Sequence, residues 1–215
     1  MPRNKYPEET VQKILDVSLK LFLEKGFEET SVLDIVNNLG GLTRGAFYHH
    51  FKSKEEVLDA LGDRMFLENN PFDKVKDEKG LSGLEKIRKV IKMQFLNEEQ
   101  QQVNLMSVSA LTSPKIFVNY LTSNQKIVAP YFEALIREGV ADGSIQSIKY
   151  PEYLASLLVF ISDIWLAPTI FPSTKEDIFK KLDFIGDVFE KLEIPILDDE
   201  IIMLITRFVN RLNIE

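Results

Sequence analysis

Apolar residues recur every three or four positions in successive segments of this chain, which is the period of α-helices that bury one face. The first such segment starts near Pro7 and ends at Gly26. Its apolar face comprises Val11, Ile14, Leu15, Ser18, Leu21 and Phe22. Two shorter helices are predicted, one at about 30–39 and one from Thr43, and a fourth helix starts at Ser53. Longer amphipathic segments fill the second half of the chain, so the sequence predicts an all-α fold.

Two glycines separate the second and third predicted helices. Ser31 precedes Asp34 at the spacing of a capping box, in which each side chain bonds the other residue's backbone N–H at a helix start. Gly40 and Gly41 then end the helix, because glycine supplies the positive φ that a tight turn requires. Thr43 is the N-cap of the next helix. Two short helices around a tight turn are typical of the helix-turn-helix, in which one helix supports another in the DNA major groove.

The first turn of the third helix carries groups suited to DNA. With Thr43 as N-cap, backbone N–H groups and the helix dipole can face a phosphate. Arg44 suits a bidentate contact with guanine, and the missing side chain of Gly45 lets the helix approach closely. Phe47 and Phe51, four residues apart, share the inward face of the helix. These two phenylalanines are therefore core candidates rather than DNA contacts.

Tyr48, His49 and His50 follow on the same helix. Tyr48 and His49 point away from the phenylalanine face, and we interpret Tyr48 as a phosphate contact rather than an ordinary surface residue. His50 is a candidate backbone contact, with capping or packing as the alternative. Neighbouring side chains on a helix point about 100° apart, and no cysteine or close carboxylate joins these histidines. The sequence therefore predicts no metal site.

A fourth helix begins with a second capping box, formed by Ser53 and Glu56. Its apolar face comprises Val57, Leu58, Leu61 and Met65. Lys54 lies in the first turn, where a cation opposes the helix dipole. A phosphate outside the protein would explain a cation at this position, so Lys54 is a candidate backbone contact.

The overall charge argues against a nucleic-acid partner, but its distribution does not. The chain carries a formal charge of −7 and has an isoelectric point of about 5.1. From Leu39 to Lys54 it contains no acid, however, and both of its histidines lie there with Arg44, Lys52 and Lys54. An acidic protein with one locally basic face remains compatible with DNA, whereas diffuse attraction to anionic membranes is disfavoured.

The segment from Ile14 to Leu61 resembles the N-terminal DNA-binding domain of the TetR family of bacterial transcriptional regulators. It reads ILDVSLKLFLEKGFEETSVLDIVNNLGGLTRGAFYHHFKSKEEVLDAL and includes the first helix, the helix-turn-helix and the closing FKSKEEVL without a gap. Gly40 stands where family members commonly have Ala. The resemblance covers roughly a quarter of the chain, and the remainder is similar only in its helical character.

The resemblance implies a homodimer whose two recognition helices enter successive major grooves of double-stranded DNA. It also implies a divergent C-terminal domain in which a small molecule binds and weakens DNA binding, as in a ligand-released repressor. The recognition helix would carry Thr43, Arg44, Gly45, Tyr48 and His49. The expected contacts to the DNA backbone are Thr30, Tyr48, His50 and Lys54.

The polar, turn-rich segment 69–80 is the predicted boundary between a DNA-binding domain with its linking helix, 1–68, and a helical effector-binding and dimerisation domain, 69–215. The expected architecture is a three-helix head joined by the linking helix to a C-terminal helical bundle. The helix at about 151–167 is apolar almost all round, so it must bury more than one face. We therefore expect helices 151–167 and 198–212 to form a four-helix interface with their mates in a homodimer.

Candidates for an effector pocket are the aromatic and polar residues on helices that converge in the C-terminal domain. They are Phe95, Met106, Phe117, Tyr120, Tyr131, Asp163 and Trp165. Aromatic residues at helical spacing are as readily ordinary core. Nothing in the sequence defines the chemistry of the ligand, and no cofactor is predicted.

Several other classes of protein are disfavoured. The chain has no cysteine, which excludes disulfides and thiolate metal sites. No secretory signal is visible in MPRNKYPEET, and no apolar run is long enough to span a membrane, so we expect a cytoplasmic protein. An enzyme is the least favoured class, because GxSxG, Walker and HExxH motifs are absent. A helical small-molecule-binding or interaction protein without DNA contacts is the alternative, but it leaves the stretch from Thr43 to Lys54 unexplained.

Overall fold

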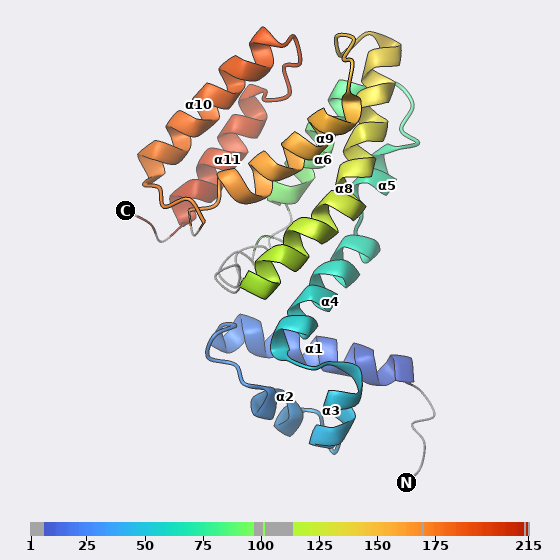
Figure 1. The fold of residues 1–215 in the computed structure, drawn as a ribbon, viewed down its shortest axis with the longest axis vertical. Helices are drawn as coiled ribbons and strands as arrows, with labels where there is room; N and C mark the ends of the chain where they lie inside the picture. Colours follow the sequence, from blue (N-terminus) through green and yellow to red (C-terminus); the bar gives the residue numbers. More distant parts are fainter. Residues whose placement is uncertain (1–6, 97–100, 102–113, 169, 213, 215) are drawn as a thin grey trace.

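The computed structural model describes residues 7–96, 101, 114–168, 170–212 and 214. These residues form helices and connecting loops without a strand, which confirms the predicted all-α fold. Figure 1 shows a small head at one end of an elongated molecule and a larger helical body at the other. The head contains α1 (Pro7–Lys25), α2 (Val32–Asn38) and α3 (Arg44–His50), and α4 (Lys54–Glu68) connects it to the body.

Local signals in the sequence determine the helix boundaries of the head. Ser31 and Asp34 form the predicted capping box at the start of α2, and Thr43 caps α3 by accepting from the Ala46 N–H. Gly40 and Gly41 have φ values of 58° and 98°, the positive φ that the turn requires. The core of the head includes fully buried residues from all four helices: Ile14, Phe22, Ile35, Leu39, Phe47 and Leu61.

The linking helix α4 belongs to two hydrophobic cores. Val57, Leu58 and Leu61 are buried in the core of the head. One turn beyond them, Phe66 packs against the core of the body, with its ring centroid 5.8 Å from that of Tyr131. The helix α4 therefore contacts both the head and the body.

The segment predicted as a polar boundary contains a short helix, α5 (Pro71–Val75). Asn70 accepts from the Phe72 N–H at its start, and Pro71 occupies the first turn, where proline is tolerated. Phe72 and Val75 are buried. The charges around these two apolar residues concealed the helix in the sequence.

The body contains α6 (Gly83–Leu96), α8 (Pro114–Asp142), α9 (Pro151–Phe160), α10 (Lys175–Lys191) and α11 (Asp199–Arg211). The long helix α8 packs against α6 and α9. Gly83 of α6 lies so close to α8 that an added Cβ would come within 2.2 Å of the Gly139 nitrogen. Asp142 at the end of α8 accepts from the Gly83 N–H at 2.7 Å. Contacts between distant parts of the chain thus define this body.

The predicted apolar helix at 151–167 consists of α9 followed by one π-helical turn, Ile161–Trp165. The terminal helix α11 packs on α6 and α10, and it buries Ile201, Leu204, Ile205 and Val209 within the same chain. Among the described residues, no helix combines the length and apolar character needed to cross a membrane.

Candidate nucleic-acid interface and ligand cavity

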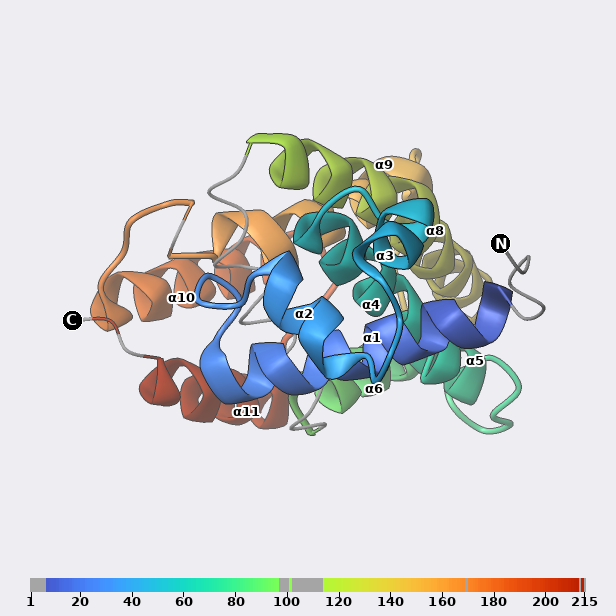
Figure 2. The ribbon, with the colours of Figure 1, turned by 90° about the horizontal axis from the view of Figure 1, so that it is seen from below.

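The third helix lies at the outer end of the head, on the side away from the body. Figure 2 looks at the molecule from this end and shows α2 and α3 nearest the viewer. Thr43, Arg44, Gly45, Tyr48 and His49 are all exposed on this helix or at its cap. The predicted recognition residues therefore share an accessible surface that no other described part of the chain covers.

Arg44 and Tyr48 form a pair on this surface. The Arg44 guanidinium carbon lies 5.4 Å from the centroid of the Tyr48 ring, and Arg44 Nη2 lies 3.5 Å from the Tyr48 hydroxyl. The cation–π contact and this weak hydrogen bond restrict the guanidinium before any partner arrives. Gly45 has open space around it, because an added Cβ would meet only Thr43 Oγ1, at 3.7 Å. Packing within the protein therefore does not require glycine at this position.

The aromatic residues of α3 divide as predicted. Phe47 is fully buried and Phe51 is 8% exposed, which confirms their assignment to the core. The Tyr48 ring meets Phe47 edge-on at 5.4 Å and is 43% exposed. The buried rings therefore fix the orientation of the helix, and Tyr48 extends from that core to the surface.

Two of the predicted backbone contacts have partners inside the head. Thr30 is 1% exposed, and its hydroxyl donates to the Gly26 carbonyl at 2.7 Å. The Lys54 ammonium donates to the carbonyls of Phe27 at 2.7 Å and Glu28 at 3.0 Å, and it lies 4.4 Å from the centroid of the Phe27 ring. These partners explain a cation in the first turn of α4 without a phosphate. Burial of Thr30 removes its hydroxyl from the surface, which argues against its predicted contact, whereas a phosphate contact by Lys54 stays a prediction.

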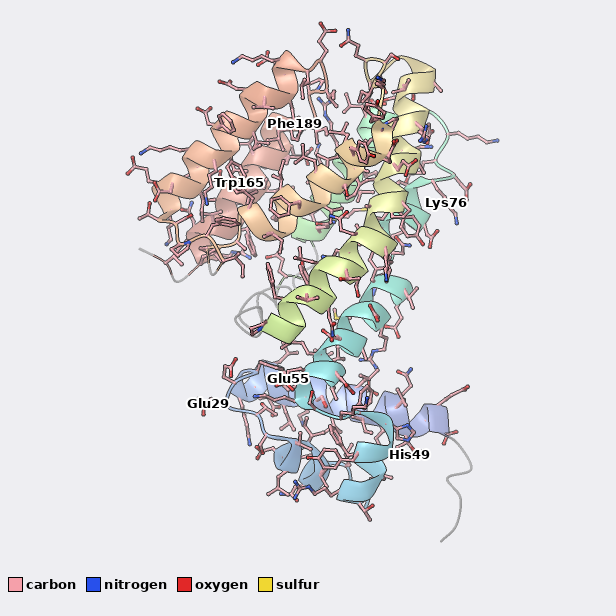
Figure 3. All side chains as sticks on the ribbon, viewed as in Figure 1. Glu29, His49, Glu55, Lys76, Trp165 and Phe189 are labelled. Carbon is pink, nitrogen blue, oxygen red and sulfur yellow. The ribbon has the colours of Figure 1, made fainter. Side chains whose placement is uncertain are left out.

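The two histidines differ in their surroundings. His49 is exposed on the head (Figure 3). His50 Nε2 is buried and has no hydrogen-bond partner among the described residues. Burial, together with the charge of His49, lowers the pKa of His50. A phosphate contact by His50 would therefore use its other ring nitrogen, Nδ1. The described residues contain no group of three or more metal-binding side chains.

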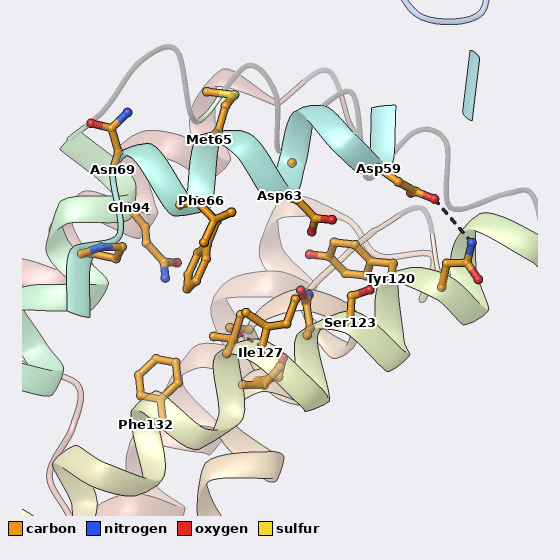
Figure 4. A pocket seen from close by; sticks show the side chains of 18 of the residues that line it. Asp59, Asp63, Met65, Phe66, Asn69, Gln94, Tyr120, Ser123, Ile127 and Phe132 are labelled. Carbon is orange, nitrogen blue, oxygen red and sulfur yellow. Dashed lines mark hydrogen bonds between the residues drawn. The ribbon is translucent and has the colours of Figure 1, made fainter. Parts of the chain in front are cut away.

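A cavity of about 950 Å³ lies in the body, directly beside α4. Figure 4 shows Asp59, Asp63 and Phe66 of α4 on one side and Tyr120 of α8 on the other. Further lining residues come from α5, α6 and α9. Sequence reasoning missed the residues from α4, because that helix was interpreted as a connection between domains. Two acids four residues apart on one helix face, Asp59 and Asp63, were the available signal.

Of the predicted effector residues, Tyr120 lines this cavity. The other aromatic candidates do not line it and pack against other side chains. Tyr131 stacks on Phe72 at 5.0 Å, Phe95 meets Phe208 at 5.7 Å, and Trp165 meets Phe184 at 6.3 Å. Phe117 packs against the core of the head. Met106 lies outside the described residues, and so does the side chain of Asp163.

Known proteins resemble both the head and the whole fold. Residues 14–61 match the model of the bacterial regulatory proteins of the tetR family. The regulator AcrR from Shigella flexneri is 44% identical over 54 residues, which are 25% of each chain. A TetR-family transcriptional regulator from Pectobacterium atrosepticum has a TM-score of 0.61 and 25% identity, covering 89% of this chain and 95% of that one. SmeT in complex with triclosan has the same fold, with a TM-score of 0.57, 18% identity, and 94% and 91% of the two chains covered.

The similarity is concentrated in the head. The aligned segments span between 25% and 53% of the lengths of the curated relatives AcrR, TetC and YerO. The family match covers most of α1, the helix-turn-helix and the first half of α4, and the fold of the Pectobacterium regulator is shared over 89% of this chain. The head is therefore similar in sequence to the bacterial regulatory proteins of the tetR family, and the fold of the chain agrees with that likeness.

Proposed function

We propose that this protein is a sequence-specific DNA-binding transcriptional regulator, and that it acts as a homodimeric repressor released by a small molecule. The observation that carries the proposal is the exposed Arg44–Tyr48 pair on α3, at the outer end of a head that is similar in sequence to the tetR family. The surrounding stretch from Leu39 to Lys54 has no acid to repel phosphates. A cytoplasmic, non-enzymatic role follows, because the target is the bacterial chromosome.

Within this proposal, Arg44 contacts a base edge and Tyr48 a phosphate. A guanidinium donates two parallel hydrogen bonds to guanine O6 and N7, so it identifies a base. A tyrosine hydroxyl bonded to a phosphate positions the helix without sequence information. Thr43, Gly45 and His49 complete the contact surface. Lys54 holds the loop before α2 and also contacts the DNA backbone.

The homodimer is proposed to form through α9 and α10. Tyr153, Leu157 and Phe160 occupy one face of α9 and are 68%, 46% and 39% exposed. Phe184 of α10 is 58% exposed and contacts Trp165 at the end of the same apolar surface. Uncovered apolar side chains at helical spacing are typical of a subunit interface.

The terminal helix contributes less to this surface than the sequence suggested. Most of the apolar face of α11 is already buried within the chain, although Ile202 and Met203 remain 43% and 44% exposed. We therefore propose that α10, rather than the predicted helix 198–212, joins α9 in the dimer interface. Sedimentation of wild type and Leu157→Glu tests the assignment. A dimer that persists in Leu157→Glu at micromolar concentration would contradict it.

Release from DNA is proposed to work through α4. Its side chains Leu58 and Met65 line the cavity, and Leu58 also belongs to the core of the head. A ligand that favours one position of α4 shifts the population of head orientations, and linkage requires that DNA weaken the ligand by the same factor. SmeT, solved with triclosan, supports a small-molecule site in this fold.

A gel-shift titration on the DNA upstream of the protein's own coding sequence tests the proposal. We expect saturable retardation that survives excess unrelated duplex, because contacts to base edges add to the contacts with phosphates. Equal competition by unrelated duplex would remove the claim of sequence specificity. Failure to bind any duplex would favour the helical ligand-binding module without DNA contacts.

A further inference from the structure

We propose that the cavity beside α4 binds a lipophilic organic cation, with the carboxylates of Asp59 and Asp63 facing its charge and aromatic side chains around its apolar part. This inference names the ligand class for the cavity that the proposed function uses, so its regulatory consequence rests on that function. The binding event itself does not require DNA.

The described lining of the cavity contains two acidic side chains and one basic side chain. Asp59 and Asp63 lie one helical turn apart on the cavity side of α4 (Figure 4). Asn119 donates to Asp59 at 3.4 Å, whereas Asp63 makes no hydrogen bond or ion pair with a described residue. Lys74 is the single cation among the described lining residues, and it forms no ion pair with either acid. Among the described residues, the cavity therefore has an excess of negative charge and one carboxylate without a partner.

The surrounding protein disfavours the charged form of Asp63. Its side chain is exposed on the open side of the cavity, and partial burial raises its pKa. A nearby cation favours the charged form of a carboxylate. A cationic ligand would supply the partner that the described residues do not.

Part of the lining is aromatic and aliphatic. Phe66, Tyr120 and Phe132 come from the two facing helices, and an aromatic ring face attracts a cation. The lining also includes Leu67, Leu96 and Ile127, which are 73%, 64% and 40% exposed. A ligand that covers these side chains gains hydrophobic free energy in addition to its charge interaction. Apolar surface around two acids matches a cation carried on a bulky hydrocarbon.

Other ligand classes fit less well. A metal ion needs several ligands at short distances, and no group of three or more suitable side chains occurs among the described residues. An anion would face two carboxylates at close range. The volume of about 950 Å³ lies at the upper end of the usual range for sites that bind drug-sized molecules. An organic cation thus agrees with the size, charge and apolar character of the cavity together.

Tetraphenylphosphonium and tetraphenylborate provide a matched test, because the two ions share size and shape and carry opposite charge. Calorimetric titration of the full-length protein without DNA should detect binding of the phosphonium, and binding of the borate should be at least about tenfold weaker. Absence of phosphonium binding, or equal affinity for both ions, overturns the proposal.

Substitution then locates the site. Asp63→Asn should weaken phosphonium binding about tenfold, since it removes one charge at close range in a partly desolvated cavity. Asp77→Asn makes the same change at an exposed loop position outside the lining and should leave affinity unchanged. Asp63→Glu, which keeps the charge, should recover most of the binding. Wild-type affinity in a folded Asp63→Asn variant, checked by thermal unfolding, overturns the assignment.

A gel shift with added phosphonium separates this inference from the proposed function. Release of DNA by the phosphonium, with loss of that release in Asp63→Asn, supports both. Charge-selective binding that leaves DNA retention unchanged supports the ligand class and contradicts release through α4. Retention of DNA by a protein that ignores both ions contradicts the ligand class alone.

Discussion

The helices of the head come from one short stretch of the chain, whereas the helices of the body come from segments far apart. Both regions cap helices locally, as Ser31 with Asp34 caps α2 and Thr174 with Asp177 caps α10. In the body, the Gly83 N–H at the start of α6 also donates to Asp142, 59 residues away, and Lys86 pairs with Glu138 across 52 residues. Local sequence therefore defines helix boundaries in both regions, whereas long-range packing places the helices of the body and forms its cavity.

This difference agrees with where the relatives are similar. AcrR is 44% identical over a 54-residue segment, whereas identity to the Pectobacterium regulator falls to 25% over most of the chain. A surface that contacts a common polymer needs one geometry, while a cavity with long-range walls can change its lining without losing the fold.

Phe47→Ala should destabilise the head most. Phe47 is fully buried between α3 and its neighbours, and removal of such a ring costs about 3–5 kcal/mol of unfolding free energy. We expect loss of DNA retention with little change in the affinity of the cavity for tetraphenylphosphonium, measured by gel shift and calorimetry. Leu23→Ala is the control, because it truncates an exposed side chain of α1 outside the proposed contact surface. Parallel loss of both activities in Phe47→Ala would show that the two regions do not unfold separately.

Arg44→Ala should affect recognition rather than folding. The side chain is exposed, and a bidentate contact with one base is worth about 1–3 kcal/mol of discrimination. The expected result is relaxed preference at one position of the site, measured by competition with single-base variants. Lys52→Ala, which changes an exposed base in the same acid-free stretch, should preserve that preference. A uniform loss across all sequences would instead indicate that Arg44 contacts phosphate.

Lys54→Ala should produce both a structural and an ionic effect. Its ammonium bonds the carbonyls of Phe27 and Glu28, so we expect a stability loss of about 1.5 kcal/mol by urea unfolding. If the same ammonium contacts a phosphate, the slope of log affinity against log salt also decreases by about one. An unchanged salt slope, together with lower stability, would assign Lys54 to the head alone.

Asp63→Asn should raise the stability of the body slightly at neutral pH. The pKa of Asp63 is raised by burial in the folded protein, so the unfolded chain loses this proton first as pH increases. The stability of the wild-type protein therefore decreases as the pH rises from the pKa of the unfolded chain to the pKa of the folded protein. It stays lower at higher pH. At pH 7 we expect the variant to melt at a higher temperature than the wild type. At a pH below both pKa values, the two proteins should melt at the same temperature. A lower melting temperature at pH 7 would mean that Asp63 has a stabilising partner.

The sequence predicted the head in detail because its signals are local. The capping residues, the two glycines with positive φ and the buried Phe47 and Phe51 all follow from spacing within one or two helical turns. The role of Lys54 was not predicted, because its partners are not local. Its carbonyl partners lie 26 and 27 residues earlier, so its position in the helix suggested an external anion instead.

The sequence did not predict the cavity, because its walls are remote from one another in the chain. Tyr131 was a candidate for ligand contact, but in the structure its ring stacks on Phe72. Phe72 belongs to α5, a helix that the sequence did not predict because its neighbours are polar. No pattern in the linking helix distinguished Asp63 from a solvated acid. Helical periodicity shows that a residue faces inward or outward, but it does not show which other helix it will face.

Selection of binding sites from random duplex DNA tests whether the protein recognises a specific sequence as a dimer, and it requires neither a known operator nor a known ligand. We predict enrichment of one pseudo-palindrome whose half-sites are centred about 34 Å apart, or a multiple of that distance, as two recognition helices on one dimer require. Arg44→Ala should enrich a site that has lost one conserved base pair in each half. Enrichment of no sequence by the folded wild-type protein would contradict the account.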